Sequence, residues 1–573
     1  MSPGRLAAAY REEVARLLAA DAIGKIWTKQ PGLWKSDPDH ARVITNRLGW
    51  IGVLETMRSE AAALAAFAEE IKQAKLTDVV LLGMGGSSLA PEVFSLTFPR
   101  PADGRRFFVL DSTDPASVLA VEKAVDLRHT LFIVASKSGQ TIETLSQFFY
   151  FHHRLYAAGA RPQGASFIAI TDDGSYLAQL AQEYSFRRTF LNRADIGGRY
   201  SALSYFGLVP AALWAVDLPA LLEGAVEMRA ACGPGAPAES NPALALGALL
   251  GAGALQGADK LFLLSTPSLV PLGNWIEQLI AESTGKEGKG IVPVAGGGIP
   301  ALETLAEGCV AAALRMESDA ATALDAAVGS LKSRGVPLVE IRLSAPVELS
   351  GEFFKWEVAT ALAGAALGID PFDEPNVQES KDNTARILDQ FQSNGEMPLG
   401  TPRLTEAGIE LYVEGPMRHS ISTLRLSEAL RTFLAQRKPG DYLVLLAYLE
   451  RNGGNGGQLE TLRAKLNERL HLPVLLGYGP RYMHSIGQLY KGGPATGMFL
   501  VITSAKAEDL PIPGAKYTFG QLQMAQALGD LQSLLRREKP ALRLHLARGA
   551  GAGLAELRRA MDQALATSRP ATG

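Results

Sequence analysis

The sequence predicts an α/β protein with mostly parallel sheets, and two observations lead to that class. Short apolar runs at 79–83, 107–110, 131–135 and 167–171 are separated by longer segments with helical periodicity. Strands that alternate with helices in this way form βαβ units, whose strands lie parallel. The same alternation returns twice further along the chain, which indicates more than one sheet domain.

The chain before the first apolar run is expected to be helical. Residues 1–75 carry apolar residues at helical spacing in AAAYREEVARLLAA and LETMRSEAAALAAFAEEIKQA, without strand-like alternation. The first sheet domain is expected over 76–235. Its end is placed at CGPGAPAESNP, residues 232–242, because this stretch is dense in Gly and Pro and has no periodicity.

Two further domains are expected, over 236–395 and 396–573. Their predicted strands are KLFLLS (260–265), IVPVAG (291–296), PLVEIRLS (337–344), DYLVLLAYL (441–449), LPVLLGYG (472–479) and GMFLVITS (497–504). The glycine-rich stretch NGGNGG, residues 452–457, predicts a loop tip, and GAGAG near residue 550 predicts a loosely ordered end.

Composition bounds the classes of partner. A chain of 573 residues is too long to fold around a single hydrophobic core. Its content of 47% hydrophobic and 20% charged residues is ordinary for a globular protein. Lys and Arg number 56 against 59 Asp and Glu, a net charge of −3. This balance favours neither nucleic acid nor an anionic membrane as a partner, so an anionic substrate has to be met locally.

The sequence also predicts a cytoplasmic protein. Two cysteines, Cys232 and Cys309, cannot form a disulfide framework and indicate a reducing compartment. The charges of Arg11 and Glu12 fall where a signal peptide needs an apolar run. The apolar stretch 243–255 is shorter than the ~20 residues of a membrane span, so a buried helix is expected there.

The first stretch that could carry chemistry is LLGMGGSSLAPE, residues 81–92, where a strand runs into a Gly-rich turn and a helix. Backbone N–H groups of such a turn can hold an anion, and glycines let that backbone come close. It lacks the G-K-[ST] of a Walker A loop. Taken alone, the stretch fits either a phosphate turn or a turn of small residues between buried elements.

A second turn, ASKSGQTIET at 135–144, also follows a predicted strand. It holds four hydroxyls, on Ser136, Ser138, Thr141 and Thr144, close to the N-terminus of the next helix. Hydroxyls together with unpaired helix N–H groups can hold a phosphate dianion. Helix capping is the alternative, but one Ser or Thr suffices for it, so the sequence favours a phosphate site.

Two charged residues are candidates for acid–base chemistry. Arg199 lies in NRADIGGRYSALSYFGLVP at 192–210. It is either a solvated surface charge or a residue whose planar guanidinium stabilises a negative charge that develops during a reaction. Glu282, in NWIEQLIAESTGKEGKG at 274–290, falls in the last turn of a helix that ends near Gly285. The negative end of the helix dipole raises a carboxyl pKa, which suits a general base, although surface glutamates at helix ends are common.

Two later segments complete the candidates. PFDEPNVQESKDN, at 371–383, holds Lys381, and RYMHSIGQLYKGG, at 481–493, holds His484. A lone histidine is more often structural than catalytic. The eight histidines show no metal-binding spacing, so no metal site is predicted.

Together these segments resemble the glucose-6-phosphate isomerase family, which is built from two sugar-isomerase (SIS) domains. The motifs that carry the resemblance are GMGGSSLAPE, SKSGQTIET, IGGRYSALS, AESTGK, FDEPNVQESK and HSIGQ. WTKQPGLW and GYGPRYMHSIGQLYKGGP are similar to the isomerase half of bacterial transaldolase–isomerase fusions. Residues 1–75 cannot hold the ~250-residue barrel of a transaldolase half. The implied fold is two doubly wound SIS domains with an N-terminal helical segment and a C-terminal α/β extension.

The resemblance also implies roles for individual residues. Ser136, Lys137, Ser138 and Thr141 would hold the phosphate of a sugar phosphate, and Gly86 and Ser87 would line the sugar side of the pocket. Glu282 would be the base that moves a proton between C2 and C1, and Arg199 would stabilise the enediolate. His484 and Lys381 would open the sugar ring. No cofactor or metal is implied.

The implied activity is the reversible isomerisation of glucose 6-phosphate and fructose 6-phosphate, by a homodimer whose site is completed by a partner's histidine. A non-catalytic SIS-type phosphosugar sensor and an isomerase that also accepts mannose 6-phosphate are the alternatives. A sensor would not need Glu282 and Arg199, and the chain shows no appended helix-turn-helix or basic patch to carry a signal.

The sequence departs from the family pattern at two positions. His484 follows Lys381, whereas in the family the histidine segment comes first. Either the topology is rearranged so that His484 enters the same pocket, or ring opening is done differently. Glu374 stands where the family commonly has glutamine, and a carboxylate beside a phosphate requires a positive partner.

Overall fold

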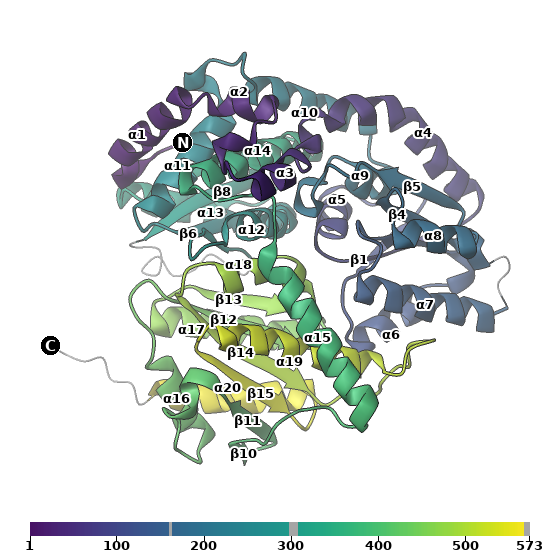
Figure 1. Ribbon diagram of the computed structural model, residues 1–573, viewed down its shortest axis with the longest axis vertical. Helices are drawn as coiled ribbons and strands as arrows, with labels where there is room; N and C mark the ends of the chain where they lie inside the picture. The colour runs from purple at the N-terminus through teal and green to yellow at the C-terminus, as the bar shows by residue number, and fades with distance from the viewer. Residues whose placement is uncertain (160–162, 297–307, 567–573) are drawn as a thin grey trace. The chain divides into compact units, whose positions relative to one another are not determined.

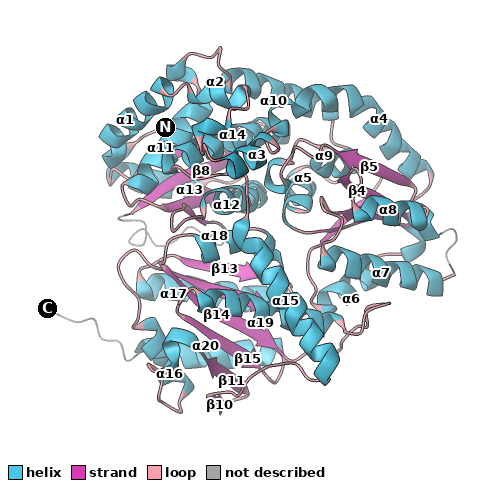
Figure 2. Ribbon diagram, viewed as in Figure 1, coloured by secondary structure: helices cyan, strands magenta, loops and turns pink. Residues whose placement is uncertain are grey.

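The computed structural model describes residues 1–159, 163–296 and 308–566, which fold into two compact units (Figure 1). Unit 1 comprises Met1–Asp111, Val121–Glu374 and His484–Gly493. Unit 2 comprises Ser112–Ala120, Pro375–Met483 and the chain from Pro494 onward. Figure 2 shows their sheets as magenta strands flanked by helices. The four predicted domain ranges are a different division of the chain and stay predictions.

The first sheet of unit 1 has five parallel strands in the order β2-β1-β3-β4-β5. They are β1 (Asp78–Gly83), β2 (Arg106–Leu110), β3 (Thr130–Ala135), β4 (Phe167–Asp172) and β5 (Arg188–Asn192). The four predicted runs are therefore strands. The sequence missed β5 because this edge strand is exposed at two of its five positions and lacks a continuous apolar run.

The second sheet of unit 1 has four parallel strands in the order β7-β6-β8-β9. They are β6 (Lys260–Ser265), β7 (Val292–Val294), β8 (Cys309–Met316) and β9 (Leu338–Leu343). The sequence missed β8, whose CVAAALRM is rich in alanine and therefore looks helical. Its burial on both faces explains why small apolar residues suffice there.

The N-terminal segment of unit 1 is helical, as predicted. Its helices are α1 (Ala7–Ala19), α2 (Ala22–Trp27), α3 (Pro38–Thr45) and α4 (Val53–Gln73). The other helices are α5 (Leu89–Thr97), α7 (Ile142–Ala157), α8 (Tyr176–Glu183), α9 (Tyr205–Leu213), α10 (Leu218–Cys232), α11 (Pro242–Leu255), α12 (Val270–Thr284), α13 (Thr322–Ser333), α14 (Leu349–Leu367) and α18 (Gly487–Gly492). One contiguous core of buried residues joins both sheets of unit 1. The stretch 232–242 lies within unit 1 and links α10 to α11.

The apolar stretch 243–255 is the buried helix α11, as expected, and it packs on α14. Small residues permit this contact. A Cβ added at Gly251 would lie 2.3 Å from Cβ of Ala366, and one at Gly247 would lie 2.7 Å from the carbonyl oxygen of Ala359. In the described parts of the chain, none of the helices has the length and apolar character needed to cross a membrane.

Unit 2 is built on a six-stranded sheet in the order β10-β11-β15-β14-β12-β13. Its strands are β10 (Leu404–Glu406), β11 (Ile409–Val413), β12 (Tyr442–Tyr448), β13 (Val474–Tyr478), β14 (Gly497–Ser504) and β15 (Ala541–Leu546). Strands β12 to β15 are parallel, while β11 pairs antiparallel with β10 and β15. Its helices are α15 (Pro375–Asn394), α16 (Leu426–Leu434), α17 (Gly453–Leu470), α19 (Phe519–Arg536) and α20 (Ala550–Ala566), and α6 (Pro115–Ala124) begins in it.

Two glycine-rich predictions in unit 2 were wrong. NGGNGG is the start of α17, where the Asn452 side chain caps the helix by accepting a hydrogen bond from the N–H of Asn455. GAGAG opens α20, and a Cβ at Gly553 would lie 2.5 Å from Cβ of Leu546. Capping and burial against the sheet offset the weak helix propensity of glycine at both places.

Candidate functional site

The first two candidate turns meet at one end of the five-stranded sheet. Strand β1 lies between β2 and β3, so the chain moves to opposite sides of β1 in its next two strands. Open α/β sheets bind ligands beyond the carboxyl ends of their strands at such a switch point. Gly83 and Ala135, which end β1 and β3, are register partners. The Gly-rich turn and the Ser/Thr turn therefore begin side by side.

The glycines of the first turn permit close backbone contacts. Gly85 has a φ of +55°, and a Cβ there would lie 2.3 Å from the carbonyl oxygen of His484. A Cβ at Gly86 would lie 2.1 Å from the carbonyl oxygen of Gly198. Ser87 is half-buried beside them. The turn thus brings together the segments that carry His484 and Arg199.

The Ser/Thr turn is arranged for more than helix capping. Thr141 occupies the N-cap position of α7, but its side chain does not cap the helix. Its Oγ1 lies 2.9 Å from Oγ of Ser136, which also accepts a hydrogen bond from the N–H of Gly139 at 3.1 Å. Ser138 is exposed, and Oγ1 of Thr144 is buried without a hydrogen-bond partner among the described residues. These hydroxyls and the α7 N-terminus can together receive an anion.

Lys137 places a positive charge beside this turn. Its Nζ pairs with Asp172 and donates a hydrogen bond to the carbonyl oxygen of Ala194 at 2.9 Å. Burial raises the pKa of Asp172, although the hydrogen bond from Lys137 opposes that effect. The ammonium group is therefore held on its neighbour rather than extended into solvent.

Arg199 is buried and clamps the chain around residue 371. It lies in the 3₁₀ turn Gly198–Tyr200 and is 3% exposed. Its guanidinium donates to Oγ of Ser283 at 2.8 Å, to the carbonyl oxygens of Pro371 at 2.8 Å and Asp373 at 2.9 Å, and to Oε2 of Glu374 at 3.1 Å. The surface-charge alternative for Arg199 is thus excluded by its burial.

Glu282 lies in the last turn of α12 and is 8% exposed. Its Oε1 is 3.7 Å from Nη1 of Arg199, and its Oε2 accepts a hydrogen bond from Nε2 of Gln278 at 3.1 Å. Burial raises the pKa of Glu282; Arg199 lowers it, and the carboxylate of Glu374 raises it further. For Arg199, burial lowers the pKa, but Glu282 and Glu374 raise it, with a net rise.

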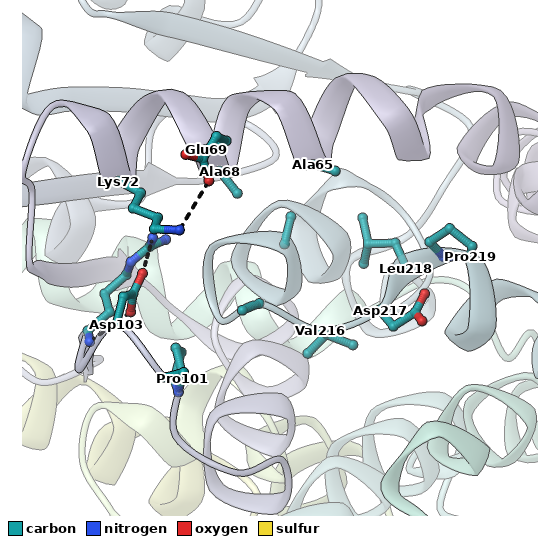
Figure 3. Close-up of a pocket in the computed structure, with 14 residues that line it drawn as sticks. Ala65, Ala68, Glu69, Lys72, Pro101, Asp103, Val216, Asp217, Leu218 and Pro219 are labelled. Carbon is teal, nitrogen blue, oxygen red and sulfur yellow. Dashed lines mark hydrogen bonds and ion pairs between the residues drawn. The ribbon is translucent and has the colours of Figure 1, made fainter.

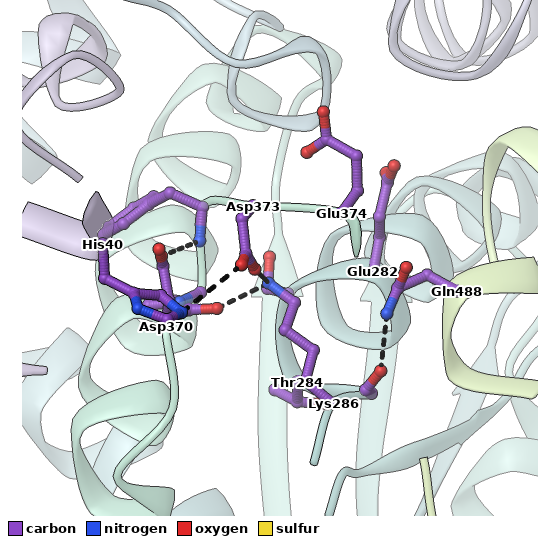
Figure 4. Close-up of polar contacts among 12 residues, drawn as sticks. His40, Glu282, Thr284, Lys286, Asp370, Asp373, Glu374 and Gln488 are labelled. Atoms are coloured by element: carbon purple, nitrogen blue, oxygen red, sulfur yellow. Dashed lines mark hydrogen bonds and ion pairs between the residues drawn. The ribbon is translucent and has the colours of Figure 1, made fainter. Parts of the chain in front are cut away.

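The loop 370–374 is fixed from two sides. Lys286, which is buried, donates to the carbonyl oxygen of Asp370 at 2.5 Å and lies 2.7 Å from Oδ1 of Asp373. The side chain of His40 lies beside Asp370 and Asp373 (Figure 4). A ring nitrogen of His40 and one carboxylate oxygen of each aspartate lie within 4.8 Å of one another. Lys286 supplies positive charge to these carboxylates. The loop thereby holds Glu374 against Arg199, which is the positive partner that this carboxylate requires.

His484 belongs to unit 1, although it comes late in the chain. Its Nε2 lies 2.8 Å from Oε1 of the buried Glu143, in the first turn of α7. Its carbonyl oxygen accepts a hydrogen bond at 2.8 Å from Gln278, the side chain that also contacts Glu282. The chain passes from unit 2 into unit 1 at His484 and back into unit 2 after Gly493, which places His484 beside Glu143 and Gln278.

Lys381 is placed differently from the other candidates. It lies on α15, an element of unit 2, and is exposed. The residues that unit 1 brings together are Gly86, Ser87, Ser136, Lys137, Ser138, Thr141, Arg199, Glu282, Glu374 and His484. The role of Lys381 in ring opening stays a prediction.

Sequence reasoning missed three residues of this site. Glu143 stands inside the quoted SKSGQTIET, and Gln278 precedes Glu282 by one helical turn, so their positions in motifs were available signals. Lys286 also stands in a quoted motif, AESTGK, but a lysine in a Gly-rich stretch is usually solvated, so the motif did not indicate a buried role for it. Only the folded loop at 370–374 shows what it contacts.

A separate hollow of unit 1, of about 410 Å³, lies between α4, the loop before β2 and the α9–α10 connection (Figure 3). Four of its charges pair with one another, since Lys72 lies 3.4 Å from Glu69 and Arg105 lies 2.8 Å from Asp103, and the fifth, Asp217, caps α10. None of the predicted site residues lines it. The turns and charges described above, rather than this hollow, form the candidate site.

Part of the chain is similar to known phosphoglucose isomerases. A family model of phosphoglucose isomerase matches residues 51–292. A curated glucose-6-phosphate isomerase of Trichormus variabilis is 32% identical over 277 residues, which are 46% of this chain and 49% of that protein. The chain spans about half the length of the relatives at this level of identity.

Solved structures share the fold. A hypothetical protein from Thermus thermophilus superposes with a TM-score of 0.57 and 24% identity, covering 67% of this chain and 99% of that one. A glucose-6-phosphate isomerase from Chlamydia trachomatis superposes with a TM-score of 0.50 and 21% identity, covering 64% and 78%. The predicted class, an α/β protein with mostly parallel sheets, is confirmed.

Proposed function

We propose that the protein interconverts glucose 6-phosphate and fructose 6-phosphate, as an isomerase similar to the isomerase half of transaldolase–isomerase fusions. One observation carries the proposal: a buried base candidate, a buried arginine and a carboxylate–imidazole pair gather around the two turns at the switch point. Glu282, Arg199 and His484 are the residues concerned. The match to the phosphoglucose isomerase family over residues 51–292 supports it, because that range contains Glu282 and Arg199.

The hydroxyls of Ser136, Ser138 and Thr141, with the α7 N-terminus, receive the phosphate. Lys137, whose ammonium group forms an ion pair with Asp172, contributes positive charge beside these hydroxyls. Gly86 and Ser87 line the sugar, since the glycine turn comes closest to Gly198 and His484. His484 gives a proton to the ring oxygen while the C1 hydroxyl gives its proton to solvent water, and the C1–O5 bond breaks to leave the open-chain aldehyde. Glu143 holds Nε2 of the imidazole and thereby orients it.

Proton transfer then needs one base. Glu282 takes the proton from C2, and the electron pair moves through the C1–C2 bond to the carbonyl oxygen, which gives a cis-enediolate. Arg199 stabilises the negative charge on that oxygen. A proton shift between the two oxygens and return of a proton to C1 produce the ketone at C2. The raised pKa of Glu282 brings it closer to neutral pH, where a base works best.

Conversion of glucose 6-phosphate to fructose 6-phosphate by the purified chain tests the proposal. Glu282→Gln keeps the hydrogen-bonding shape but cannot accept the proton, so kcat should fall by ~10² or more with a modest change in KM. Glu223→Gln, on the exposed face of α10, is the matched control and should retain activity. A near-normal kcat for Glu282→Gln would remove Glu282 from the mechanism, and binding without conversion by the unmodified chain would instead fit a sensor.

The wider setting is also proposed. The reaction belongs to glycolysis and gluconeogenesis in the cytoplasm, the protein forms a homodimer, and mannose 6-phosphate is a candidate second substrate because it differs at C2 alone. His484 reaches Glu143 within its own chain, so that pair forms without a partner's histidine. Light scattering of the purified chain tests the dimer, and a competition assay with mannose 6-phosphate tests the substrate range.

A further inference from the structure

The parallel strands of unit 2 repeat the order that places the candidate site in unit 1. Strand β12 lies between β13 and β14, and β15 follows β14. The chain therefore moves from one side of β12 to the other between its second and third parallel strands. The switch point lies between β12 and β14, where an open α/β sheet offers a ligand crevice.

A pocket of about 310 Å³ lies at this switch point. Tyr448 pairs with Thr503, and Thr503 pairs with His545, so the three residues form a row across β12, β14 and β15 near their carboxyl ends. All three line the pocket, together with Gln523 and Met524 from the N-terminal turns of α19. Its volume lies at the lower end of the range for small-molecule sites.

Gln523 supplies a second, independent observation. Its side chain is 1% exposed, and its Nε2 has no hydrogen-bond partner within the described parts of the chain. Buried polar groups are almost always paired, so an amide left without a partner at a pocket wall needs an explanation. A ligand that completes the hydrogen bonds of Gln523 provides one.

The charges around the pocket are already balanced by the protein. Lys506 pairs with Asp114 at 2.5 Å. Asp509 accepts hydrogen bonds from the N–H groups of Leu510 and Gly520, both at 2.8 Å, and Thr518 caps α19. The N-terminus of α19 thus has its anionic partner within the chain. A ligand with a net charge would meet no unmatched opposite charge here.

We propose that this pocket of unit 2 binds a small uncharged molecule that presents a hydrogen-bond donor beside an acceptor to the amide of Gln523. A side-chain amide both donates and accepts, and it matches two kinds of such molecule. One is the amide edge of a nucleobase in a nucleoside, and the other is a pair of adjacent hydroxyls on a free sugar. Met524 and the ring of Tyr448 supply apolar surface for the rest of either molecule.

Ligand-observed NMR of the full chain with uridine and with D-fructose tests the proposal and separates the two sources. At least one of the two should show saturation transfer from the protein, and Gln523→Met should weaken its binding by about tenfold or more. Gln392→Met, at an exposed position of α15, is the matched control and should bind as the unmodified chain does. Excess glucose 6-phosphate should not displace the probe. The proposal is overturned if neither probe binds, or if Gln523→Met binds as well as the control.

A measurement without ligand gives an independent test. Methionine has nearly the shape of glutamine but no amide, so Gln523→Met removes an unpaired buried group. The variant should unfold at a midpoint about 1–3 °C above that of the unmodified chain, whereas Gln392→Met should not. A lower midpoint for Gln523→Met would show that the amide has a stabilising partner in the folded chain and would refute the argument for a ligand.

Discussion

Replacing Arg199 by lysine keeps a positive charge in the site but removes the planar fork that four acceptors share. Those acceptors are Oγ of Ser283, the two carbonyl oxygens of Pro371 and Asp373, and the carboxylate of Glu374, all between 2.8 and 3.1 Å from a guanidinium nitrogen. A lysine ammonium cannot span them. With three N–H donors for four acceptors, it leaves at least one of them without its donor.

The loss of stability follows from that count. A buried acceptor left unpaired costs about 1–3 kcal/mol, so Arg199→Lys should destabilise unit 1 by about 1–3 kcal/mol. Arg199→Met should cost at least as much, because it also leaves the buried Glu282 without its positive neighbour. Scanning calorimetry of the full chain should show the first unfolding transition several degrees lower in both variants.

The two variants should differ in pH dependence. Nη1 of Arg199 lies 3.7 Å from Oε1 of Glu282, close enough for the guanidinium charge to stabilise the ionised carboxylate. Arg199 lowers the pKa of Glu282, so its loss raises that pKa. The acid limb of kcat/KM should therefore move to higher pH in Arg199→Met, and by less in Arg199→Lys, which keeps a positive charge.

The reasoning would be refuted by either of two results. An unchanged first transition in Arg199→Lys would mean that the three hydrogen bonds from Arg199 to residues 371, 373 and 374 do not hold the 370–374 loop. An acid limb that stays in place in Arg199→Met would mean that Glu282 is not the group that titrates in the reaction.

Three further changes have defined outcomes. Gly85→Ala forces a Cβ to within 2.3 Å of the His484 carbonyl oxygen at a φ of +55°, so kcat should fall by about tenfold or more while KM changes less. Ser136→Ala removes the partner of Thr141 and of the Gly139 N–H, so KM for glucose 6-phosphate should rise about tenfold at similar kcat. Burial raises the pKa of Glu357, so its stabilising contribution is lost as pH rises above 4.5; the unfolding midpoint of Glu357→Gln should exceed that of the unmodified chain at pH 8 and match it near pH 4.5.

Much of the fold was predictable because the strands of the sheet interiors are continuous apolar runs. The runs at 79–83, 131–135, 260–265 and 497–504 lie within strands. The missed strands are the half-exposed edge strand β5 and the alanine-rich β8, which lack this signal, and in unit 2 also β10, β11 and β15. Both glycine-rich segments of unit 2 were misjudged because helix capping and burial against a sheet cannot be inferred from local propensity.

The candidate site was predictable where one motif held the chemistry. The Ser/Thr turn and Glu282 at its helix end are examples. What the sequence could not show was the network between motifs: Gln278 linking Glu282 to His484, and Lys286 fixing the loop that carries Glu374. These contacts depend on chain reversals between distant segments. One example is the segment 484–493, which belongs to unit 1 although the chain on both sides of it belongs to unit 2.

The central claim is that Glu282 moves a proton between C2 and C1 of a sugar phosphate. Its most direct test is the reaction of glucose 6-phosphate with the full chain in D₂O, followed by NMR of the product. The account predicts fructose 6-phosphate with deuterium at C1 in part of the molecules, because a proton held on a carboxylate exchanges with solvent, and no such product from Glu282→Gln on the same time scale. Absence of fructose 6-phosphate, or a product without any deuterium at C1, would contradict it.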